Sequence, residues 1–159
     1  MQLIQPPTPL SSLSLDKAVF LAGSIDLGKS VDWQAQLALS LADCPGTLLN
    51  PRRPHWDSSW LAEAAFPPFR EQVQWELAAM EAAGMIAFYF APQSQAPVTL
   101  LELGLAARER KAVVCCPPGY WRKGNVDVVC EHYNIPMVTA LEDLGREIRS
   151  YLSSLHAFE

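Results

Sequence analysis

The sequence lacks the features that mark membrane-spanning and secreted proteins. No stretch of it approaches the roughly 20 consecutive apolar residues of a transmembrane helix. Residues 1–16 contain no basic start followed by an apolar core, so they do not resemble a secretory signal. From these two absences we expect a cytoplasmic protein that does not bind a membrane.

Motifs for metals, dinucleotides and nucleophilic triads are missing as well. The four cysteines form no Cys-x-x-Cys pair and no Cys/His cluster with zinc spacing. The glycines fit neither the G-x-G-x-x-G fingerprint nor a phosphate-binding P-loop. No Ser/His/Asp or Cys/His triad can be argued from the spacing of these residue types. We therefore expect no metal and no cofactor, and we interpret the cysteines as buried, reduced thiols.

Positive charge is scarce. Only 18% of the residues are charged, and the net charge is −5. The basic residues are scattered, apart from short groups such as Arg52-Arg53 and Arg122-Lys123. Binding of a nucleic acid polymer needs a basic face, so we expect no such partner. A single small anionic group could still be met by an arginine pair.

The chain does contain many short apolar runs. Half of its 159 residues are hydrophobic, which is enough to bury a single core. From Lys17 onward, short apolar runs alternate with amphipathic stretches, a pattern typical of βαβ units. Five strands are predicted, at residues 18–21, 47–50, 85–90, 112–115 and 135–138. We expect a flavodoxin-like, doubly wound parallel sheet in three layers, with strand order 2-1-3-4-5.

Residues 17–159 are predicted to form one domain, preceded by a flexible arm. The arm, residues 1–16, is rich in proline and serine. Ligands of doubly wound sheets bind beyond the carboxyl ends of the strands. The loops that deserve inspection therefore begin at Gly23, Asn50, Phe90 and Cys116. A glycine directly after the first strand lets the backbone approach a ligand, and the adjacent Ser24 and Ile25 can border it.

One carboxylate, Glu102, interrupts the apolar run of residues 98–105. If Thr99 or a neighbour caps a helix at this point, Glu102 lies near its first turn, where the helix dipole favours an ionised carboxylate. Such a carboxylate is a competent nucleophile for a sugar anomeric carbon. The alternative is a capping box with Thr99, in which Glu102 satisfies backbone amides only. The residues alone favour the capping box, because capping boxes are common and nucleophilic glutamates are rare.

Glu76 lies on the helix predicted before the third strand. Gln72, Trp75, Glu76 and Ala79 share one face of that helix by their i, i+3, i+4 spacing. A Gln, a Trp and a Glu on one stripe can line a pocket. They can equally form a solvated face with one packed tryptophan, and the residues alone favour this simpler alternative.

Two stiff loops carry the remaining candidates. Loop 50–57 contains two prolines and presents Arg53, Trp56 and Asp57, which can stack on a base or bond to base edges, hydroxyls or phosphate. The alternative is a rigid surface loop in which Trp56 is a packing plug, and the residues favour neither interpretation. Loop 117–125 carries two aromatic residues, and its Asn125 is a candidate N-cap for the following helix.

Together these segments resemble the nucleoside 2-deoxyribosyltransferase-like family, with most likeness to a bacterial branch. The resemblance spans about residues 17–138 and rests on the order and spacing of several pieces rather than on one motif. The pieces are residues 20–25 (FLAGSI), 50–53 (NPRR), 72–76 (QVQWE), 100–105 (LLELGL) and 121–125 (WRKGN).

The resemblance implies a retaining mechanism in which a glutamate attacks C1′ of a 2′-deoxynucleoside and forms a covalent deoxyribosyl-enzyme. A second base or water then collects the sugar. Glu102 falls at the nucleophile position, so the resemblance favours a nucleophilic role of Glu102 over the capping box. Glu76 falls near an acidic residue that holds the substrate, and residues 23–25 border the sugar. Asn125 falls where a neighbouring subunit completes the site in relatives, which implies a homodimer or a larger assembly.

The chain also departs from the family pattern. An Ala-Asp pair that is common before the third strand is Ala83-Gly84 in this chain. Transferases of the family place an aspartate six positions before the nucleophile, where this chain has Ala96. The missing acid leaves the protonation of the departing base without an assigned residue.

Two functional hypotheses follow. In the first, the protein cleaves or transfers the N-glycosidic bond of a 2′-deoxynucleoside or its monophosphate, and the loops around Trp56 and Trp121 frame the base. In the second, it is a non-catalytic nucleotide-binding or sensing module with the same pocket. If Arg52 and Arg53 meet a 5′-phosphate, monophosphates should bind better than nucleosides. Gln72, Arg53, Asp57 and Phe90 complete the predicted substrate contacts.

Overall fold

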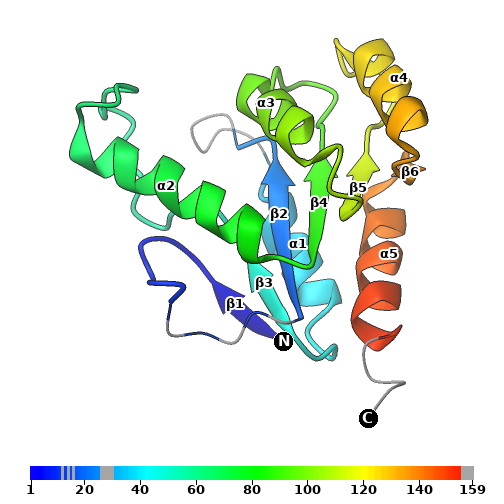
Figure 1. The fold of residues 1–159 in the computed structure, drawn as a ribbon, viewed down its shortest axis with the longest axis horizontal. Helices are drawn as coiled ribbons and strands as arrows, with labels where there is room; N and C mark the ends of the chain where they lie inside the picture. The colour runs from blue at the N-terminus through cyan, green and yellow to red at the C-terminus, as the bar shows by residue number, and fades with distance from the viewer. Residues whose placement is uncertain (12, 14, 16, 26–30, 155–159) are drawn as a thin grey trace.

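A sheet of parallel strands forms the centre of the molecule (Figure 1). Over the residues that the structure describes, namely 1–11, 13, 15, 17–25 and 31–154, this computed structural model has six strands in the order β1-β3-β2-β4-β5-β6. The strands are β1 (Gln2–Ile4), β2 (Ala18–Gly23), β3 (Thr47–Leu49), β4 (Met85–Tyr89), β5 (Ala112–Cys115) and β6 (Met137–Val138). The prediction of a parallel α/β sheet is confirmed.

The prediction of five strands in the order 2-1-3-4-5 is wrong, because an edge strand is missing from it. The predicted strands correspond to β2 to β6 and keep their relative order, but β1 adds a sixth strand beside β3, with Ile4 opposite Leu49. Only Ile4 of the three β1 residues is buried, so this segment shows no pattern from which a strand could be predicted.

The segment expected to be a flexible arm makes further contacts with the domain. Gln5 Nε2 donates a hydrogen bond to the Arg52 carbonyl at 2.8 Å, and Trp75 Nε1 donates one to the Thr8 carbonyl at 2.8 Å. Residues 12, 14 and 16 of this segment lie outside the described residues. Over residues 2–4, then, the segment belongs to the sheet.

Helices cover both faces of the sheet (Figure 1). On one face lie α1 (Trp33–Ser40) and α5 (Leu141–Ser154), and on the other α2 (Pro67–Ala82), α3 (Pro97–Ala106) and α4 (Lys123–Tyr133). Alternation along β2 explains the two cores, because Phe20 packs with α2, α3 and α4 while Val19 and Leu21 pack with α1 and α5. In the described part of the chain, no helix has both the length and the apolar character needed to cross a membrane.

The cysteines are part of these cores. Cys44, Cys115, Cys116 and Cys130 are all free and buried. Burial raises the pKa of Cys115 and of Cys130 to about 12 and that of Cys116 to about 11, so these thiols stay protonated. The interpretation of the cysteines as buried thiols is confirmed.

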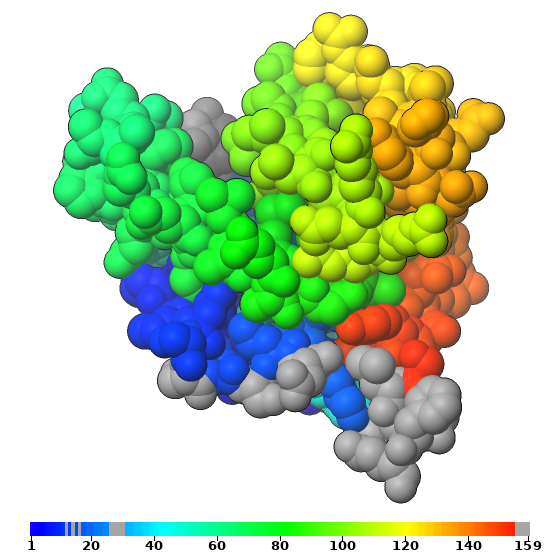
Figure 2. All heavy atoms as spheres, in the orientation of Figure 1, coloured from blue at the N-terminus to red at the C-terminus, as the bar shows by residue number. Residues whose placement is uncertain are grey.

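The fold brings several segments together at one edge of the sheet. Strands β2, β3 and β4 are parallel neighbours, so their carboxyl ends lie at the same edge. The α2 helix leads into β4 and α3 follows it, and both helices cover the same face. The surface of the molecule is hollowed between them (Figure 2).

Candidate functional site

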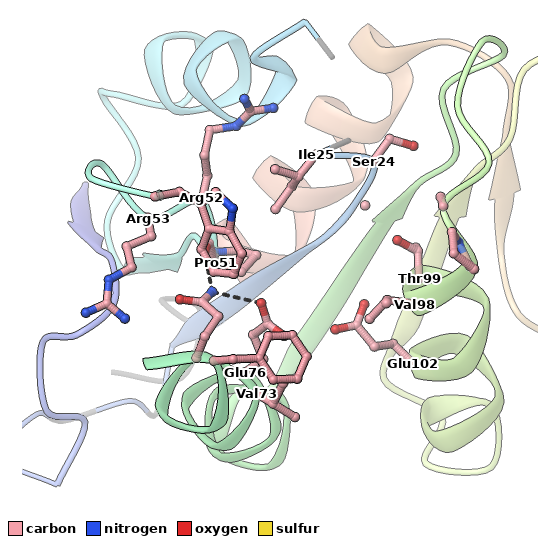
Figure 3. A pocket seen from close by; sticks show the side chains of 16 residues that line it. Ser24, Ile25, Pro51, Arg52, Arg53, Val73, Glu76, Val98, Thr99 and Glu102 are labelled. Atoms are coloured by element: carbon pink, nitrogen blue, oxygen red, sulfur yellow. Dashed lines mark hydrogen bonds between the residues drawn. The ribbon is translucent and has the colours of Figure 1, made fainter. Parts of the chain in front are cut away.

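A pocket of about 380 Å³ opens at this edge, between α2, α3 and the ends of β2 and β3 (Figure 3). Its volume falls within the range of small-molecule sites, and its place is the one that doubly wound sheets use for ligands. Eight of the eleven residues proposed from the sequence line it: Gly23, Ser24, Ile25, Arg53, Trp56, Gln72, Glu76 and Glu102.

Glu102 enters the pocket from the second turn of α3. The helix begins at Pro97, and its N-cap is Ala96, whose side chain makes no capping bond. The alternative of a capping box between Thr99 and Glu102 is therefore wrong, since Thr99 already lies inside the helix. Thr99 and Glu102 instead share the face that lines the pocket, and Glu102 is only 9% exposed.

Glu76 faces Glu102 across the pocket from α2 (Figure 3). Burial, and secondly the negative charge of Glu76, raises the pKa of Glu102 to about 8. Burial also raises the pKa of Glu76, while the hydrogen bond from Gln72 acts in the opposite direction. Burial therefore works against the ionised carboxylate that a helix start was expected to favour at Glu102, because the raised pKa keeps the proton on this carboxyl up to higher pH.

Gln72 connects Glu76 to the loop after β3. Its Nε2 donates hydrogen bonds to Glu76 Oε1 at 2.8 Å and to the Pro51 carbonyl at 2.8 Å (Figure 3). The side chain is 5% exposed, and its Oε1 is buried without a hydrogen-bond partner among the described residues. The amide thus fixes the position of one carboxylate of the pocket.

Gly23 and Ser24 support the scaffold as well as the pocket wall. A Cβ on Gly23 would lie 2.5 Å from Trp33 Cζ2 and 2.6 Å from the Tyr89 carbonyl oxygen, so a larger residue would displace α1. Ser24 is fully buried, and its Oγ accepts a hydrogen bond from the Ala91 N–H at 3.2 Å. Packing against Trp33 and the Tyr89 carbonyl therefore explains the glycine without the approach of a ligand that was expected.

Arg52 and Arg53 line the pocket, but both guanidinium groups point away from it (Figure 3). Arg52 Nε donates a hydrogen bond to Gln34 Oε1 at 3.2 Å and lies 3.4 Å from Asp32 Oδ1. Arg53 Nη1 lies 2.9 Å from Glu71 Oε2. Each arginine thus has a carboxylate partner outside the pocket.

Trp56 gives the pocket an aromatic wall. Its ring packs edge-on against Trp60, with ring centroids 4.9 Å apart. Its Nε1 is buried, and the part of the chain that the structure describes offers this atom no hydrogen-bond partner. A ligand that presents an acceptor to this wall would satisfy that donor.

Three of the predicted contacts lie outside the pocket lining. Phe90 is fully buried and packs on Tyr120, with ring centroids 4.9 Å apart. Asp57 is exposed and accepts hydrogen bonds from the Ser59 N–H at 2.9 Å and the Ser59 Oγ at 2.7 Å, which shape the loop. Asn125 is exposed on the first turn of α4, inside the helix, so its predicted N-cap role is wrong.

The second stiff loop is tied to the segment before α3 instead of to the pocket. Tyr120 Oη and Trp121 Nε1 both donate hydrogen bonds to the Gln95 carbonyl, at 2.7 and 2.9 Å. Trp121 remains half-exposed and does not line the pocket. The hypothesis that Trp121 frames a base therefore receives no support from its position in this chain.

Several residues of the pocket were not proposed from the sequence. Phe69 and Val73 lie on the same stripe of α2 as the two polar residues that were proposed, so helical periodicity would have found them. Thr99 precedes Glu102 by three residues and could have been found in the same way. Ala96 lines the pocket with a left-handed backbone, φ 43°, for which the sequence gives no signal.

Chemically, the pocket offers two carboxyl groups in largely apolar surroundings. A buried carboxyl with a raised pKa can hold or pass a proton, and once ionised it can attack an electrophilic carbon. Within the described ranges, no group of three or more His, Cys, Asp or Glu side chains could hold a metal ion. The two carboxyl groups of the pocket can thus supply acid–base and nucleophilic chemistry.

Comparison with known proteins places the chain in a family. A crystal structure of a conserved protein from Enterococcus faecalis V583 has a similar fold, with a TM-score of 0.56 and 15% identity over 85% of this chain and 98% of that one. No curated protein matches the sequence. The family model described as "Nucleoside 2-deoxyribosyltransferase like" matches residues 16–120, more than half of the 159 residues. The chain therefore belongs to the nucleoside 2-deoxyribosyltransferase-like family.

Proposed function

We propose that the protein cleaves or transfers the N-glycosidic bond of a 2′-deoxynucleoside or its monophosphate, with Glu102 as the nucleophile. The observation that carries the proposal is the position of the buried Glu102 carboxyl, which faces Glu76 across a pocket of about 380 Å³. Membership of the family supports the same chemistry. The reaction needs no cofactor.

The proposed reaction has two steps at C1′ of the sugar. Glu102, once it has lost its proton, attacks C1′ with one carboxylate oxygen. The bond from C1′ to the base nitrogen breaks, both electrons leave with the base, and the base takes up a proton. A second base or a water molecule then attacks C1′ and releases the Glu102 carboxylate, which gives transfer or hydrolysis with retained configuration.

The other pocket residues have proposed roles that follow from their positions. Glu76 accepts hydrogen bonds from sugar hydroxyls, and Trp56 stacks against the base. Ala96 carries no acid, so the proton for the departing base must come from another group. Transfer of the Glu102 proton to Glu76 would create the nucleophile and leave an acid beside the sugar in one step.

The arginine pair supports a nucleoside over its monophosphate. Arg52 and Arg53 are paired with Asp32 and Glu71 outside the pocket, and their guanidinium groups point away from it. A 5′-phosphate would have to displace these partners. We expect the affinity for a 2′-deoxynucleoside to equal or exceed that for its monophosphate at both low and high salt. Tighter binding of the monophosphate that weakens with salt would restore the phosphate role of the arginines.

We also propose that two or more copies of the chain associate. The outer face of α3 exposes three apolar side chains, Val98, Leu101 and Leu105. Val98 also lines the pocket, so a second copy on this face would border the site. We expect Leu101→Glu to lower the molar mass measured by light scattering. Leu39→Glu, at an exposed leucine of α1, should leave the molar mass unchanged. A wild-type monomer would contradict this proposal.

The decisive test of the chemistry is release of free base from a panel of 2′-deoxynucleosides, followed by chromatography. We expect release by the wild-type protein and a loss of at least about a thousandfold in Glu102→Gln. Glu109→Gln, an exposed glutamate just after α3, is the matched control and should keep the wild-type rate. Equal rates in both variants would remove Glu102 from the mechanism.

A second candidate function is a non-catalytic nucleotide-binding or sensing module. Two features favour it: Ala96 has no acid to protonate a leaving base, and burial raises the pKa of Glu102 to about 8, which disfavours its ionised, nucleophilic form at neutral pH. This candidate predicts that nucleosides bind to the pocket, as measured by calorimetry, and that no base appears after long incubation. Base release that depends on Glu102 would exclude it.

A further inference from the structure

The side chain of Gln72 has a fixed orientation. Its Nε2 lies between two acceptors, Glu76 Oε1 and the Pro51 carbonyl oxygen, each at 2.8 Å. A flipped amide would place its oxygen, which can only accept, against the Pro51 carbonyl. Because the side chain is buried, neither bond can be replaced by bulk water without a cost. Gln72 therefore always presents a donor to Glu76.

The two carboxyl groups of the pocket receive different support. Among the described residues, Gln72 donates to Glu76, whereas no residue donates a hydrogen bond to Glu102. The other charged groups around the pocket are Arg52 and Arg53, which are paired outside it. Ser24, after β2, also lines the pocket, and its Oγ accepts a hydrogen bond from the Ala91 N–H at 3.2 Å. The asymmetry between the carboxyls thus comes from Gln72.

We propose that Gln72 is a positioning residue that keeps the negative charge of the carboxyl pair on Glu76 and so leaves the shared proton on Glu102. This inference concerns the same pocket as the proposed function. It describes the protein before substrate reacts, with Glu102 protonated and Glu76 ionised. It rests on the hydrogen bonds of the pair and does not require turnover. The nucleophile is masked by its own proton until that proton moves.

The direction of the pKa shifts agrees with this division of charge. The hydrogen bond from Gln72 counters the rise that burial imposes on the pKa of Glu76, and the charge that remains on Glu76 helps to raise the pKa of Glu102 to about 8. Glu102 therefore becomes a free carboxylate when the pH rises above about 8 or when its proton passes to Glu76.

The wild-type protein provides the first test, by carbon-13 NMR of glutamate labelled at the carboxyl carbon. Signals of the pair are assigned with Glu76→Gln and Glu102→Gln. At pH 7 we expect the Glu102 signal at the position of a protonated carboxyl and the Glu76 signal at that of a carboxylate. The reverse order of titration, with Glu102 ionising before Glu76, would overturn the inference.

Removal of the donor provides the second test. Gln72→Met keeps the length of the side chain and loses both hydrogen bonds. A hydrogen bond to a charged group changes an equilibrium by roughly tenfold to a hundredfold, so the proton should shift by that ratio from Glu102 toward Glu76 at pH 7. Gln74→Met, exposed on the same helix, is the matched control and should leave the wild-type division.

The outcomes separate this inference from the proposed function. An unchanged division of the proton in a folded Gln72→Met protein would overturn the positioning role, whatever the protein catalyses. If Gln72→Met does not fold, the order of titration in the wild type decides alone. A protein that releases no base but shows the predicted order and shift would contradict the proposed function and still support the role of Gln72.

Discussion

Two pairs of charged side chains border the same pocket, and the fold treats them in opposite ways. Arg52 and Arg53 each have a carboxylate partner outside the pocket, Asp32 and Glu71. Glu76 and Glu102 face one another, and within the described part of the chain neither forms an ion pair with a cation (Figure 3). The two cations are paired with carboxylates outside the pocket, while the two acidic side chains face each other inside it.

This contrast separates scaffold from chemistry. The arginines hold the loop after β3 against α1 and α2. Their charges are paired with the carboxylates of Asp32 and Glu71. The carboxyl pair makes no ion pair of this kind among the described residues, and two buried carboxyl groups without a cation cannot both ionise without a cost, which raises the pKa of Glu102. Groups with raised pKa values in a cleft are typical of functional sites. The ion pairs of the arginines explain how the loop after β3 is fixed in place. The two carboxyl groups, which have no such partner among the described residues, indicate the chemistry of the pocket.

The largest expected effect comes from breaking the acidic pair at Glu102. The pKa of about 8 lies above its ordinary value of 4.5, so the wild type loses stability as the pH rises from about 4.5 to about 8. We expect Glu102→Gln to be more stable than the wild type by on the order of 3–5 kcal/mol at pH 9 and equally stable at pH 4. Urea unfolding at both pH values measures the difference. A wild-type stability that is flat over this range would show that Glu102 is not the buried acid described above.

The second effect comes from removing the other member of the pair. Glu76→Gln abolishes the charge that helps to raise the pKa of Glu102. The acidic limb of the pH profile of kcat/KM for base release should therefore move to lower pH. At pH 9 the rate should fall about tenfold to a hundredfold, because sugar hydroxyls lose a charged acceptor. Glu81→Gln, exposed on the same helix, should change neither quantity. An unmoved limb would mean that the two carboxyls do not interact.

Substitution of the arginines should have smaller effects on stability and on ligand binding. Arg52→Met loses the contacts with Asp32 and Gln34, and since the Arg52 side chain is only 15% exposed we expect a loss of about 1–2 kcal/mol in the free energy of unfolding. The ratio of nucleoside to monophosphate affinity should stay the same. A selective loss of monophosphate binding in this variant, measured by calorimetry, would reassign Arg52 from scaffold to ligand.

The smallest effect is expected at Arg53. Its partner Glu71 is 54% exposed, and ion pairs with an exposed member are worth about 0–1 kcal/mol. Arg53→Met should therefore lower the free energy of unfolding by less than about 1 kcal/mol and leave base release near the wild-type rate. A large loss of activity without a loss of stability would point to a direct role of Arg53 in binding.

Much of the fold could be predicted from the sequence, because buried parallel strands are short apolar runs. The runs at residues 18–21, 85–90 and 112–115 each fall on a strand of the structure, namely β2, β4 and β5. The edge strand β1 could not be predicted, since two of its three residues are exposed and its only strand neighbour is β3. Its formation depends on a partner more than 40 residues away in the chain, at Thr47–Leu49.

Part of the site could be predicted from the sequence, because residue spacing along a helix shows which side chains share a face. The spacing of Gln72 and Glu76 placed both on one face of a helix, and that face lines the pocket. The direction of the two arginines depends on Asp32 and Glu71, which local sequence does not bring together with them. The Asp57 carboxylate accepts hydrogen bonds from Ser59 in its own loop. In the sequence alone, an aspartate with such a local role cannot be told from one that binds a ligand.

The measurement that tests the central claim most directly is the mass of the intact protein after incubation with 2′-deoxynucleosides. We expect an added mass of one deoxyribosyl unit on the wild type, located on Glu102 by peptide mapping, and none on Glu102→Gln. We also expect more adduct at pH 8.5 than at pH 6, because the pKa of Glu102 is raised to about 8. A wild-type protein that binds a 2′-deoxynucleoside but forms no adduct and releases no base at either pH would contradict the proposal that Glu102 is the nucleophile.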